Sequence, residues 1–511
     1  TGGLPPGDKG RIGLAASRTR SNIIYATIEH ADSSGFYRSD NGGRSWERMN
    51  KLNPRPMYYS HIFVDPNNDD IVYMLATEFY RTEDKGKTFY QMPTRPTYDV
   101  GVHSDHHTIW INPSNSNHFF LAGDAGLHES WDYGKSYNRL NNIPIGQFYG
   151  IGVDMDIPYN IYGGMQDNHS WMGPSATRHW LGILSDDWRQ IGFGDGMYQQ
   201  PAPNSSILYN ATQNGNIIRV DRKTGNMQGL KPFPADPDEK YRFDWVTPLM
   251  ISKQSPKRIY LGGNRLFISN DGGLSWDRTK DLTKDINRDS LKIMDVLVVD
   301  TKISRNDGTS SYGEIISMDE SPLWYKILWV GTDDGNLQVS RDGGKHWNEV
   351  SQNIYGLPSA SYVSRVISSK KGRGTAYVTF DRHREGDWSP YVFRTDDYGQ
   401  TWQDLSDDLP SGSINVILEH PDNANVLFLG TEHAVFISMN SGNDWVEFNS
   451  NLPTTLYDDM VIHPREKDLV LGTHGRSFWV LDDTAPLAEW SESLDSPVHI
   501  YSIRPTTLFH Y

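Results

Sequence analysis

The octapeptide SNDGGLSW at residues 269–276 occurs in seven related copies, and these copies decide the fold. The other six are SDNGGRSW (39–46), TEDKGKTF (82–89), SWDYGKSY (130–137), SRDGGKHW (340–347), TDDYGQTW (395–402) and SMNSGNDW (438–445). Seven copies of one motif cannot all be the active site of one chain. The octapeptide therefore marks a structural repeat rather than a single site.

The spacing of the copies gives the number of repeats. The third position holds an Asp or its amide: Asn41, Asp84, Asp132, Asp271, Asp342, Asp397 and Asn440. Neighbouring copies are 43 to 71 residues apart, except for one interval of 139 residues, which is close to three periods. Two units without the octapeptide fill that interval, at 148–168 and 196–225, and a third follows at 460–483. The sequence thus contains ten units.

Each unit has the same internal order. A short apolar run closed by a Pro/Asn/Asp turn, as in HIFVDPNNDD, precedes a β-rich run such as IVYMLAT. A third run, the octapeptide and a polar run complete the unit. Four short strands at a period of 40–50 residues are typical of a propeller blade. The sequence predicts an all-β propeller of about ten four-stranded blades.

Composition limits the classes of partner and cofactor. The 511 residues carry a net charge of −16 with scattered Lys and Arg, which disfavours nucleic acid and anionic lipid as partners. The chain has no Cys, so thiolate metal sites and disulfides are excluded. No apolar run approaches the roughly 20 residues of a membrane helix. We expect no cofactor, no resident metal and no membrane insertion.

The octapeptide resembles the Asp-box, S/T-x-D-x-G-x-x-W/F, with Asn at two of the Asp positions and Tyr137 at one aromatic position. The resemblance implies a hairpin between the two outer strands of each blade. A Ser or Thr hydroxyl and an Asp carboxylate can bond the backbone N–H groups of the turn, and Gly can take positive φ. The seven third-position residues are therefore expected to have a structural role.

Longer stretches resemble secreted bacterial BNR-repeat, or sortilin-like, proteins, and the Asp-box is also shared with xyloglucanase-type glycosidases. They include KGRIGLAASR (9–18), RPMYYSHIFVDPNN (55–68), DHHTIWINP (105–113), WVGTDDGNLQVSRDGGKHW (329–347) and LVLGTHGRSFWVLDD (469–483). The resemblance implies an extracellular or periplasmic location. It also implies a longer polypeptide, with about four further repeats before residue 1.

Fourteen repeats would make two seven-bladed propellers. On that reading, residues 1–141 are three blades of a first propeller, residues 142–485 form a seven-bladed propeller, and residues 486–511 are a C-terminal tail. The alternative is one ten-bladed propeller, as in sortilin. The sequence leaves both open.

A His/Asp cluster in VHSDHH (102–107) is the first candidate site. In an extended segment alternate residues share a face, so His103, Asp105 and His107 would point together and His106 away. Such a face could bind a sugar hydroxyl or, with three ligands, hold a divalent metal in an open site. It would equally suit a channel-lining strand whose polar side chains bond one another.

Polar residues also follow the second strand of several units, where short loops tend to face one end of a propeller channel. Asp195, in GFGDGMY, starts a unit, and Trp171 lies in a unit without the octapeptide. These residues would form a polar mouth of the channel, although each of them also suits ordinary turn chemistry. The candidates are Asp124, Asp167, Asn168, Trp171, Asp195, Asp333, Glu432, His433, His474 and Arg476.

Two functions remain open. The first is a non-catalytic extracellular scaffold that binds a protein or a glycan at the polar mouth, or binds the remainder of its own polypeptide. The alternative is a glycoside hydrolase of the xyloglucanase-like tandem-propeller type, with Asp124 and Asp195 as candidate catalytic carboxylates. A sialidase is disfavoured, since no early F/Y-R-I/V-P motif is present. The sequence also has no P-loop and no Ser-His-Asp elbow, the motifs of nucleotide-binding enzymes and of α/β-hydrolases.

Overall fold

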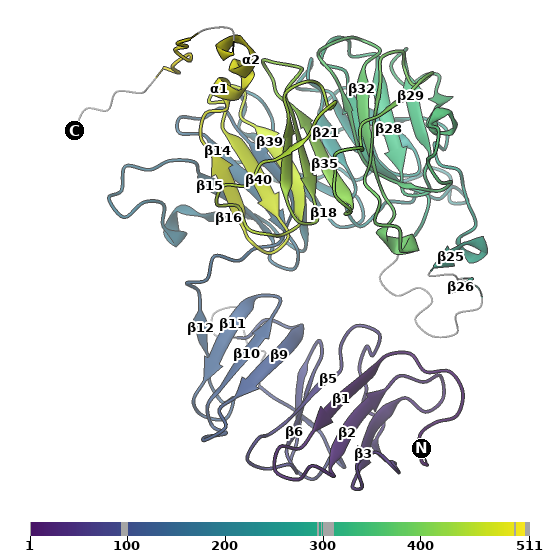
Figure 1. Ribbon diagram of the computed structural model, residues 1–511, viewed down its shortest axis with the longest axis vertical. Helices are drawn as coiled ribbons and strands as arrows, with labels where there is room; N and C mark the ends of the chain where they lie inside the picture. The colour runs from purple at the N-terminus through teal and green to yellow at the C-terminus, as the bar shows by residue number, and fades with distance from the viewer. Residues whose placement is uncertain are drawn as a thin grey trace. The chain divides into compact units, whose positions relative to one another are not determined.

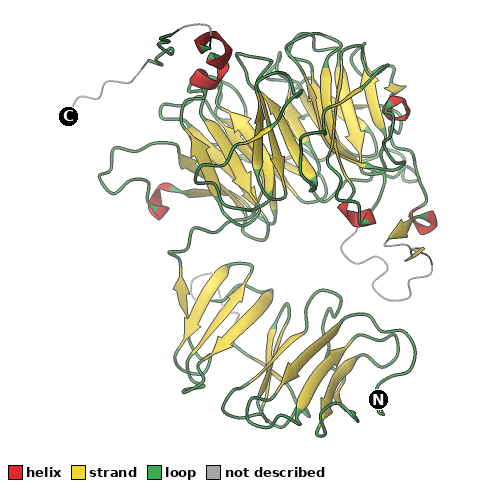
Figure 2. Cartoon of the chain, viewed as in Figure 1, coloured by secondary structure: helices red, strands yellow, loops and turns green. Residues whose placement is uncertain are grey.

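The computed structural model describes residues 2–93, 101–293, 296–297, 299, 311–494 and 497–505. These residues are almost entirely strand and loop (Figure 2). They fall into two compact units, Thr1–Pro144 with Val296–Gly308, and Ile145–Asp295 with Thr309–Tyr511. The helical segments are one turn each: η1 (Ser185–Asp187), η2 (Arg288–Ser290), η4 (Ser351–Asn353), η5 (His383–Glu385), α1 (Ala485–Ala488) and α2 (Trp490–Ser493). None of the described helices has the length and apolarity that crossing a bilayer requires.

The first unit contains three four-stranded antiparallel sheets, in each of which consecutive strands pair. The sheets are β1 (Ile12–Ala16), β2 (Ile24–Ile28), β3 (Gly35–Ser39), β4 (Glu47–Asn50); β5 (His61–Val64), β6 (Val72–Leu75), β7 (Phe79–Thr82), β8 (Tyr90–Gln91); and β9 (His106–Ile111), β10 (Phe119–Gly123), β11 (Gly126–Ser130), β12 (Asn138–Leu140).

The second unit contains seven such sheets, of which the last has three strands in the described residues. The first three are β13 (Phe148–Val153), β14 (Asn160–Met165), β15 (Ser170–Pro174), β16 (Arg189–Gly192); β17 (Gly196–Pro201), β18 (Ile207–Thr212), β19 (Asn216–Asp221), β20 (Met227–Gly229); and β21 (Leu249–Ile251), β22 (Ile259–Gly262), β23 (Leu266–Ser269), β24 (Asp277–Arg278).

The remaining four sheets follow a stretch that holds the short strands β25 (Lys292–Ile293) and β26 (Val296–Leu297). They are β27 (Ile315–Glu320), β28 (Leu328–Thr332), β29 (Leu337–Ser340), β30 (Asn348–Glu349); β31 (Tyr362–Ser368), β32 (Ala376–Asp381), β33 (Tyr391–Thr395), β34 (Gln403–Asp404); β35 (Ile414–Glu419), β36 (Leu427–Thr431), β37 (Val435–Ser438), β38 (Val446–Glu447); and β39 (Tyr457–Ile462), β40 (Leu469–Thr473), β41 (Phe478–Leu481).

Burial explains the pattern of apolar residues in each sheet. The second strand is covered on both faces by neighbouring sheets, and its sequence is correspondingly a continuous apolar run, as in VYML of β6 or LWVGT of β28. The fourth strand is short and exposed, as in β24 and β38. The core therefore consists of layers between adjacent sheets rather than of one central cluster.

The seven sheets of the second unit, coloured blue to yellow in Figure 1, close into a ring. The ring closes because β39 of the last sheet packs against β13 of the first. Several contacts join these two sheets. The Tyr159 hydroxyl donates to Asp468 Oδ2 at 3.0 Å, and His463 Nε2 lies 2.8 Å from the carbonyl oxygen of Asp154. The rings of Phe148 and Phe478 stack with centroids 3.8 Å apart.

The seven octapeptides form the turn between the third and fourth strands of seven sheets, the position that the resemblance implied. In the hairpin after β23, the Ser269 hydroxyl donates to Asp271 Oδ1 at 2.7 Å and accepts from the Gly273 N–H at 2.8 Å. Asp271 also accepts from the N–H and the hydroxyl of Ser275, at 3.0 and 2.6 Å. These bonds lower the pKa of Asp271 to about 2.

Glycine at the fifth position is required by conformation and by space. Gly273 has φ of 91°, and a Cβ there would lie 2.5 Å from Leu230 Cδ1 of the preceding sheet. Trp276 ends the hairpin and donates its indole N–H to the carbonyl oxygen of Leu230 at 2.8 Å. The hairpin thus joins its own sheet to the one before it.

The prediction of an all-β propeller of about ten blades is confirmed, with nine four-stranded sheets and one three-stranded sheet in the described residues. The domain boundaries stay a prediction, as does the membership of residues 1–141 in a larger propeller. Part of the predicted tail, residues 495–496 and 506–511, lies outside the described residues.

Candidate functional site

The His/Asp cluster of the first unit is not one extended segment. Strand β9 begins only at His106, and Asp105 has a φ of 70°, in the left-handed region. The alternation of faces that the sequence predicts therefore fails before His106. His103 is exposed, with its Nδ1 2.8 Å from the carbonyl oxygen of Ser104.

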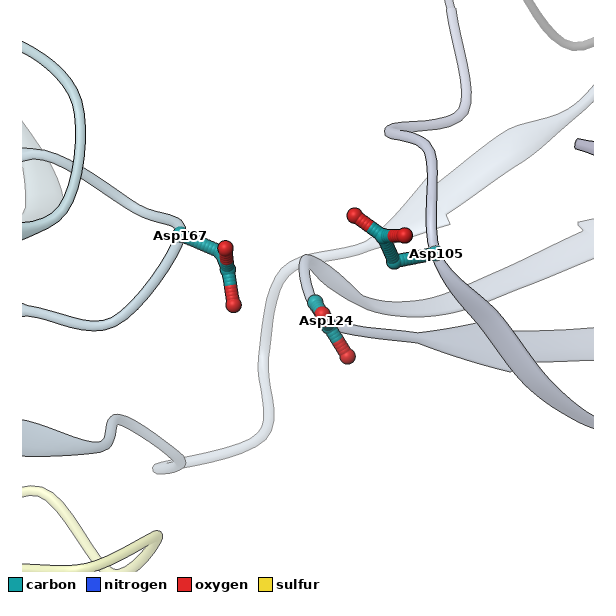
Figure 3. A group of neighbouring side chains, drawn as sticks. All are labelled: Asp105, Asp124 and Asp167. Carbon is teal, nitrogen blue, oxygen red and sulfur yellow. The ribbon is translucent and has the colours of Figure 1, made fainter. Parts of the chain in front are cut away.

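The remaining polar groups of the cluster contact residues of adjacent strands. His107 Nε2 lies 2.7 Å from Asp124 Oδ1, which follows β10. Figure 3 shows Asp105 and Asp124 at the ends of these strands, where the Asp124 N–H donates to the carbonyl oxygen of Asp105 at 3.1 Å. His106 points into the core, and burial lowers its pKa to about 4. The structure thus pairs His107 with Asp124, whereas His103 contacts the carbonyl oxygen of Ser104.

The second unit has a polar face at one end of its ring. In an antiparallel sheet the start of the first strand lies beside the end of the second, so Tyr457 pairs with Thr473 and Ile315 with Thr332. The first strand of each sheet is the inner strand of the ring. Residues that precede the first strands and residues that follow the second strands consequently meet at one end of the ring. We call this end of the ring the channel mouth. Its residues are Gln147, Tyr149, Gln166, Asp195, Trp245, Asp458 and His474.

A continuous set of side-chain contacts runs along the channel mouth. Gln147 forms an isolated bridge with His474, and its side-chain amide donates to Gln166 Oε1. The Tyr149 hydroxyl donates to the same oxygen at 2.8 Å and accepts from the indole N–H of Trp245 at 3.3 Å. The set joins the last sheet of the ring to the first and third.

Asp458 and His474 form a carboxylate–imidazole pair at this end, with Oδ2 and Nδ1 3.0 Å apart. The carboxylate raises the pKa of His474. Burial raises the pKa of Asp458, and the imidazole opposes that shift. His474 was a predicted site residue, and Arg476 beside it is exposed, with its backbone N–H bonded to Thr473 Oγ1 at 2.9 Å.

Three further predicted residues lie in or beside the loop that follows β14. Asp167, also labelled in Figure 3, donates its backbone N–H to Asp195 Oδ1 at 3.2 Å. The Asn168 side-chain amide donates to the carbonyl oxygen of Gln166 at 2.9 Å, and Trp171 donates to the carbonyl oxygen of Asn168 at 2.7 Å. These bonds fix the loop that carries Gln166.

Below the mouth, side chains from several first strands of the second unit contact one another across the ring. Arg365 on β31 reaches past β35 to Asp459 on β39, with Nη2 3.2 Å from Oδ1. Asp459 Oδ2 accepts from the Ile151 N–H of β13 at 3.0 Å. A hydrogen bond between Tyr198 on β17 and Arg365 helps to raise the pKa of Arg365. Side chains from β17, β31 and β39 thus meet at the centre of the ring.

The sequence reasoning missed Gln147, Gln166, Trp245, Asp458 and the central Arg365–Asp459 pair. Gln147 stands immediately before a first strand and Gln166 immediately after a second strand, the same places that gave Asp195 and His474. Aligning the ten units on those two places would have found these two residues. Trp245 lies further from its strand and Asp458 lies inside β39, so that alignment would not have found them. Arg365 lies inside a strand, and only the closed ring reveals its partner.

Comparisons with known proteins agree with the repeat pattern. Residues 390–492 match the family model described as Sortilin, neurotensin receptor 3 (Sortilin-Vps10). The oligoxyloglucan-reducing end-specific xyloglucanase of Emericella nidulans is 25% identical over 220 residues, which are 42% of this chain and 24% of that protein. Xyloglucanase Xgh74A of Acetivibrio thermocellus is 21% identical over 325 residues, 52% of this chain and 37% of that protein. The chain thus spans only about a quarter to a third of these relatives.

Two solved structures were also matched. The GH74 enzyme of Niastella koreensis is 14% identical, with a TM-score of 0.25 over 92% of this chain and 83% of that one. YCF48 of Cyanidioschyzon merolae is 8% identical, with a TM-score of 0.37 over 76% and 96% of the two chains. These scores are too low to support an argument. From its octapeptide hairpins and its sequence matches, the chain is a β-propeller protein of the BNR/Asp-box repeat type.

Proposed function

We propose that this chain is a non-catalytic extracellular propeller that binds a neutral polysaccharide of the xyloglucan class at the channel mouth of its second unit. The observation that carries the proposal is the unbroken row of amide, hydroxyl and indole groups from Gln147 to Trp245. Amides and hydroxyls both donate and accept hydrogen bonds, as sugar hydroxyls do. The xyloglucanase relatives support the choice of polysaccharide.

Trp245 supplies the apolar part of this surface. Its side chain is 42% exposed although its indole N–H is bonded to Tyr149. An indole ring held at one edge has a large rigid face and loses little conformational entropy when a sugar ring packs on it. A few convergent polar groups around an aromatic face are typical of small-molecule and sugar sites.

Structural contacts of the carboxylates at and below the mouth favour binding over hydrolysis. At the mouth, Asp195 accepts the Asp167 N–H and Asp458 pairs with His474. Below it, Asp459 is held by Arg365 and the Ile151 N–H. An inverting glycosidase needs one carboxylate to activate water and a second to protonate the leaving oxygen. Carboxylates that already fix the fold are poorly placed for either task.

Affinity electrophoresis in gels containing tamarind xyloglucan tests the proposal. Trp245→Ala should weaken retention of the chain about tenfold or more, equivalent to at least ~1.4 kcal/mol. Trp324→Ala is the matched control, because Trp324 is 38% exposed but lies in the turn between β27 and β28, at the opposite end of the ring. Equal retention of wild type and Trp245→Ala, or no retention of wild type, would refute the proposal.

A xyloglucan-cleaving glycoside hydrolase is the second candidate. Besides the names of the relatives, one local feature favours it: burial raises the pKa of Asp458, as a general acid requires. A reducing-sugar assay on xyloglucan decides between the two functions. Release of reducing ends that is lost in Asp458→Asn, or in Asp124→Asn or Asp195→Asn, would replace the binding proposal by the hydrolase.

A further inference from the structure

Three carboxylates from two adjacent sheets of the second unit converge, and one of them, Asp244, directly precedes Trp245 in the sequence. Asp244 precedes β21, Glu314 precedes β27, and Asp333 follows β28. One oxygen of each lies within 4.8 Å of an oxygen of the other two. The three residues are far apart in the sequence and show no metal-ligand spacing, which is why the sequence predicts no metal here.

The burial of these groups is difficult to explain by the protein alone. Glu314 is 0% exposed, and neither of its carboxylate oxygens has a hydrogen-bond partner among the described residues. Asp333 is buried as well and accepts the N–H groups of Gly313 and Glu314 at 3.1 and 2.7 Å. A buried carboxylate without a partner is strongly disfavoured, and neighbouring like charge adds to that cost. Burial accordingly raises the pKa of both acids.

Two basic side chains near the cluster, Arg242 and Arg384, form no ion pair with it among the described residues, although Arg242 opposes the rise in the pKa of Glu314 and Arg384 that of Asp244. Arg242 donates to the carbonyl oxygen of Gly313 at 3.2 Å and to Asp281 Oδ2 at 3.4 Å. Within the described part of the chain, no ion pair involves Asp244, Glu314 or Asp333. The fourth acid nearby, Asp334, is occupied by Thr332 and by the Lys284 N–H. The charge of the cluster is therefore left for a ligand.

The ligand set and its spacing fit Ca²⁺. Ca²⁺ binds oxygens at about 2.4 Å, so two ligands of one ion are at most ~4.8 Å apart, and the three oxygens lie within that limit. Mg²⁺ is usually held by one or two carboxylates and keeps several waters, so three converging carboxylates favour Ca²⁺. The geometry points to a Ca²⁺ site formed by Asp244, Glu314 and Asp333, which links the third and fourth sheets of the ring. Water would complete the six to eight ligands that Ca²⁺ prefers.

The site is tested by titrating the chelator-treated chain with CaCl₂ in a calorimeter and with TbCl₃ by luminescence. The charge of Asp333 affects the pKa of the Tyr312 phenol, and the charges of Asp244 and Asp333 affect that of the Tyr362 phenol. Both tyrosines therefore lie close to the site and should sensitise Tb³⁺ emission. We expect one Ca²⁺ per chain, a Tm that falls on adding EDTA, and at least tenfold weaker binding of Mg²⁺. Neither readout depends on polysaccharide binding.

Glu314→Gln should lower the Ca²⁺ affinity at least tenfold and remove the Tb³⁺ signal. If this variant does not fold, Asp244→Asn replaces it, because Asp244 is only half-buried, and the same two losses are expected. Asp281→Asn is the control, because Asp281 already has partners in Arg242, Asn264 and Thr283, and it should keep both signals. A wild-type chain that binds no Ca²⁺, together with a Glu314→Gln variant at least as stable, would overturn the site. The carboxyl groups would then share a proton instead.

Discussion

Ser269→Ala tests the structural role of the octapeptide without changing a charge. The Ser269 side chain is 1% exposed and makes the 2.7 Å bond to Asp271 and the 2.8 Å bond from the Gly273 N–H. Alanine removes both bonds, at about 0.5–1 kcal/mol each, and leaves the buried Gly273 N–H without its acceptor, which adds ~1–2 kcal/mol. The variant should therefore lose about 2–4 kcal/mol of unfolding free energy.

Scanning calorimetry measures this loss. For a unit of roughly 350 residues, an unfolding entropy of about 2.1 cal/mol/K per residue converts ~2–4 kcal/mol into a fall in Tm of about 3–6 °C. Ser275→Ala, which removes only an exposed hydroxyl from the same turn, should lower Tm clearly less. Retention on xyloglucan should be unchanged in both variants. An unchanged Tm for Ser269→Ala, or a loss of binding without a loss of stability, would refute the structural reading of the octapeptide.

Two further predictions concern the closed ring and its mouth. Because Asp458 raises the pKa of His474, the pair stabilises the fold below the ordinary histidine pKa of about 6.5 and loses that contribution as the pH rises through the raised pKa. The difference in unfolding free energy between wild type and His474→Gln should therefore shrink with rising pH. An NMR titration that gives His474 an ordinary or lowered pKa would contradict this. Gly163→Ala places a Cβ 2.4 Å from Phe148 and 2.5 Å from Phe478, so it should destabilise the second unit by about 1–3 kcal/mol in urea unfolding, and a neutral result would argue against the packing of the first sheet on the last.

The repeat made the fold predictable from the sequence. The hydroxyl, carboxylate and glycine of the octapeptide bond within one turn, so their roles follow from local chemistry alone. Apolar runs such as VYML likewise follow from burial on both faces. The closure of the ring depends instead on pairs such as Tyr159 and Asp468, which lie 309 residues apart and have no local signal.

The candidate site was only partly predictable for the same reason. Asp195 and His474 were found because they follow a rule of position within each unit. The orientation of His103 and Asp105 could not be predicted from the sequence. The prediction required an extended segment, and the left-handed conformation of Asp105 interrupts it. Gln166 and Trp245 carry no motif, and only their contact through Tyr149 identifies them as one surface.

Hydrogen–deuterium exchange of the chain with and without a xyloglucan oligosaccharide tests the central claim most directly, because it reports the hairpins and the channel mouth in one experiment. Sugar should slow exchange in the backbone around Gln147, Gln166 and Trp245 and leave the seven octapeptide hairpins unchanged. Protection of the hairpins with no change around Gln147, Gln166 and Trp245 would contradict the account, since it would make the octapeptide the binding site and the mouth a structural surface.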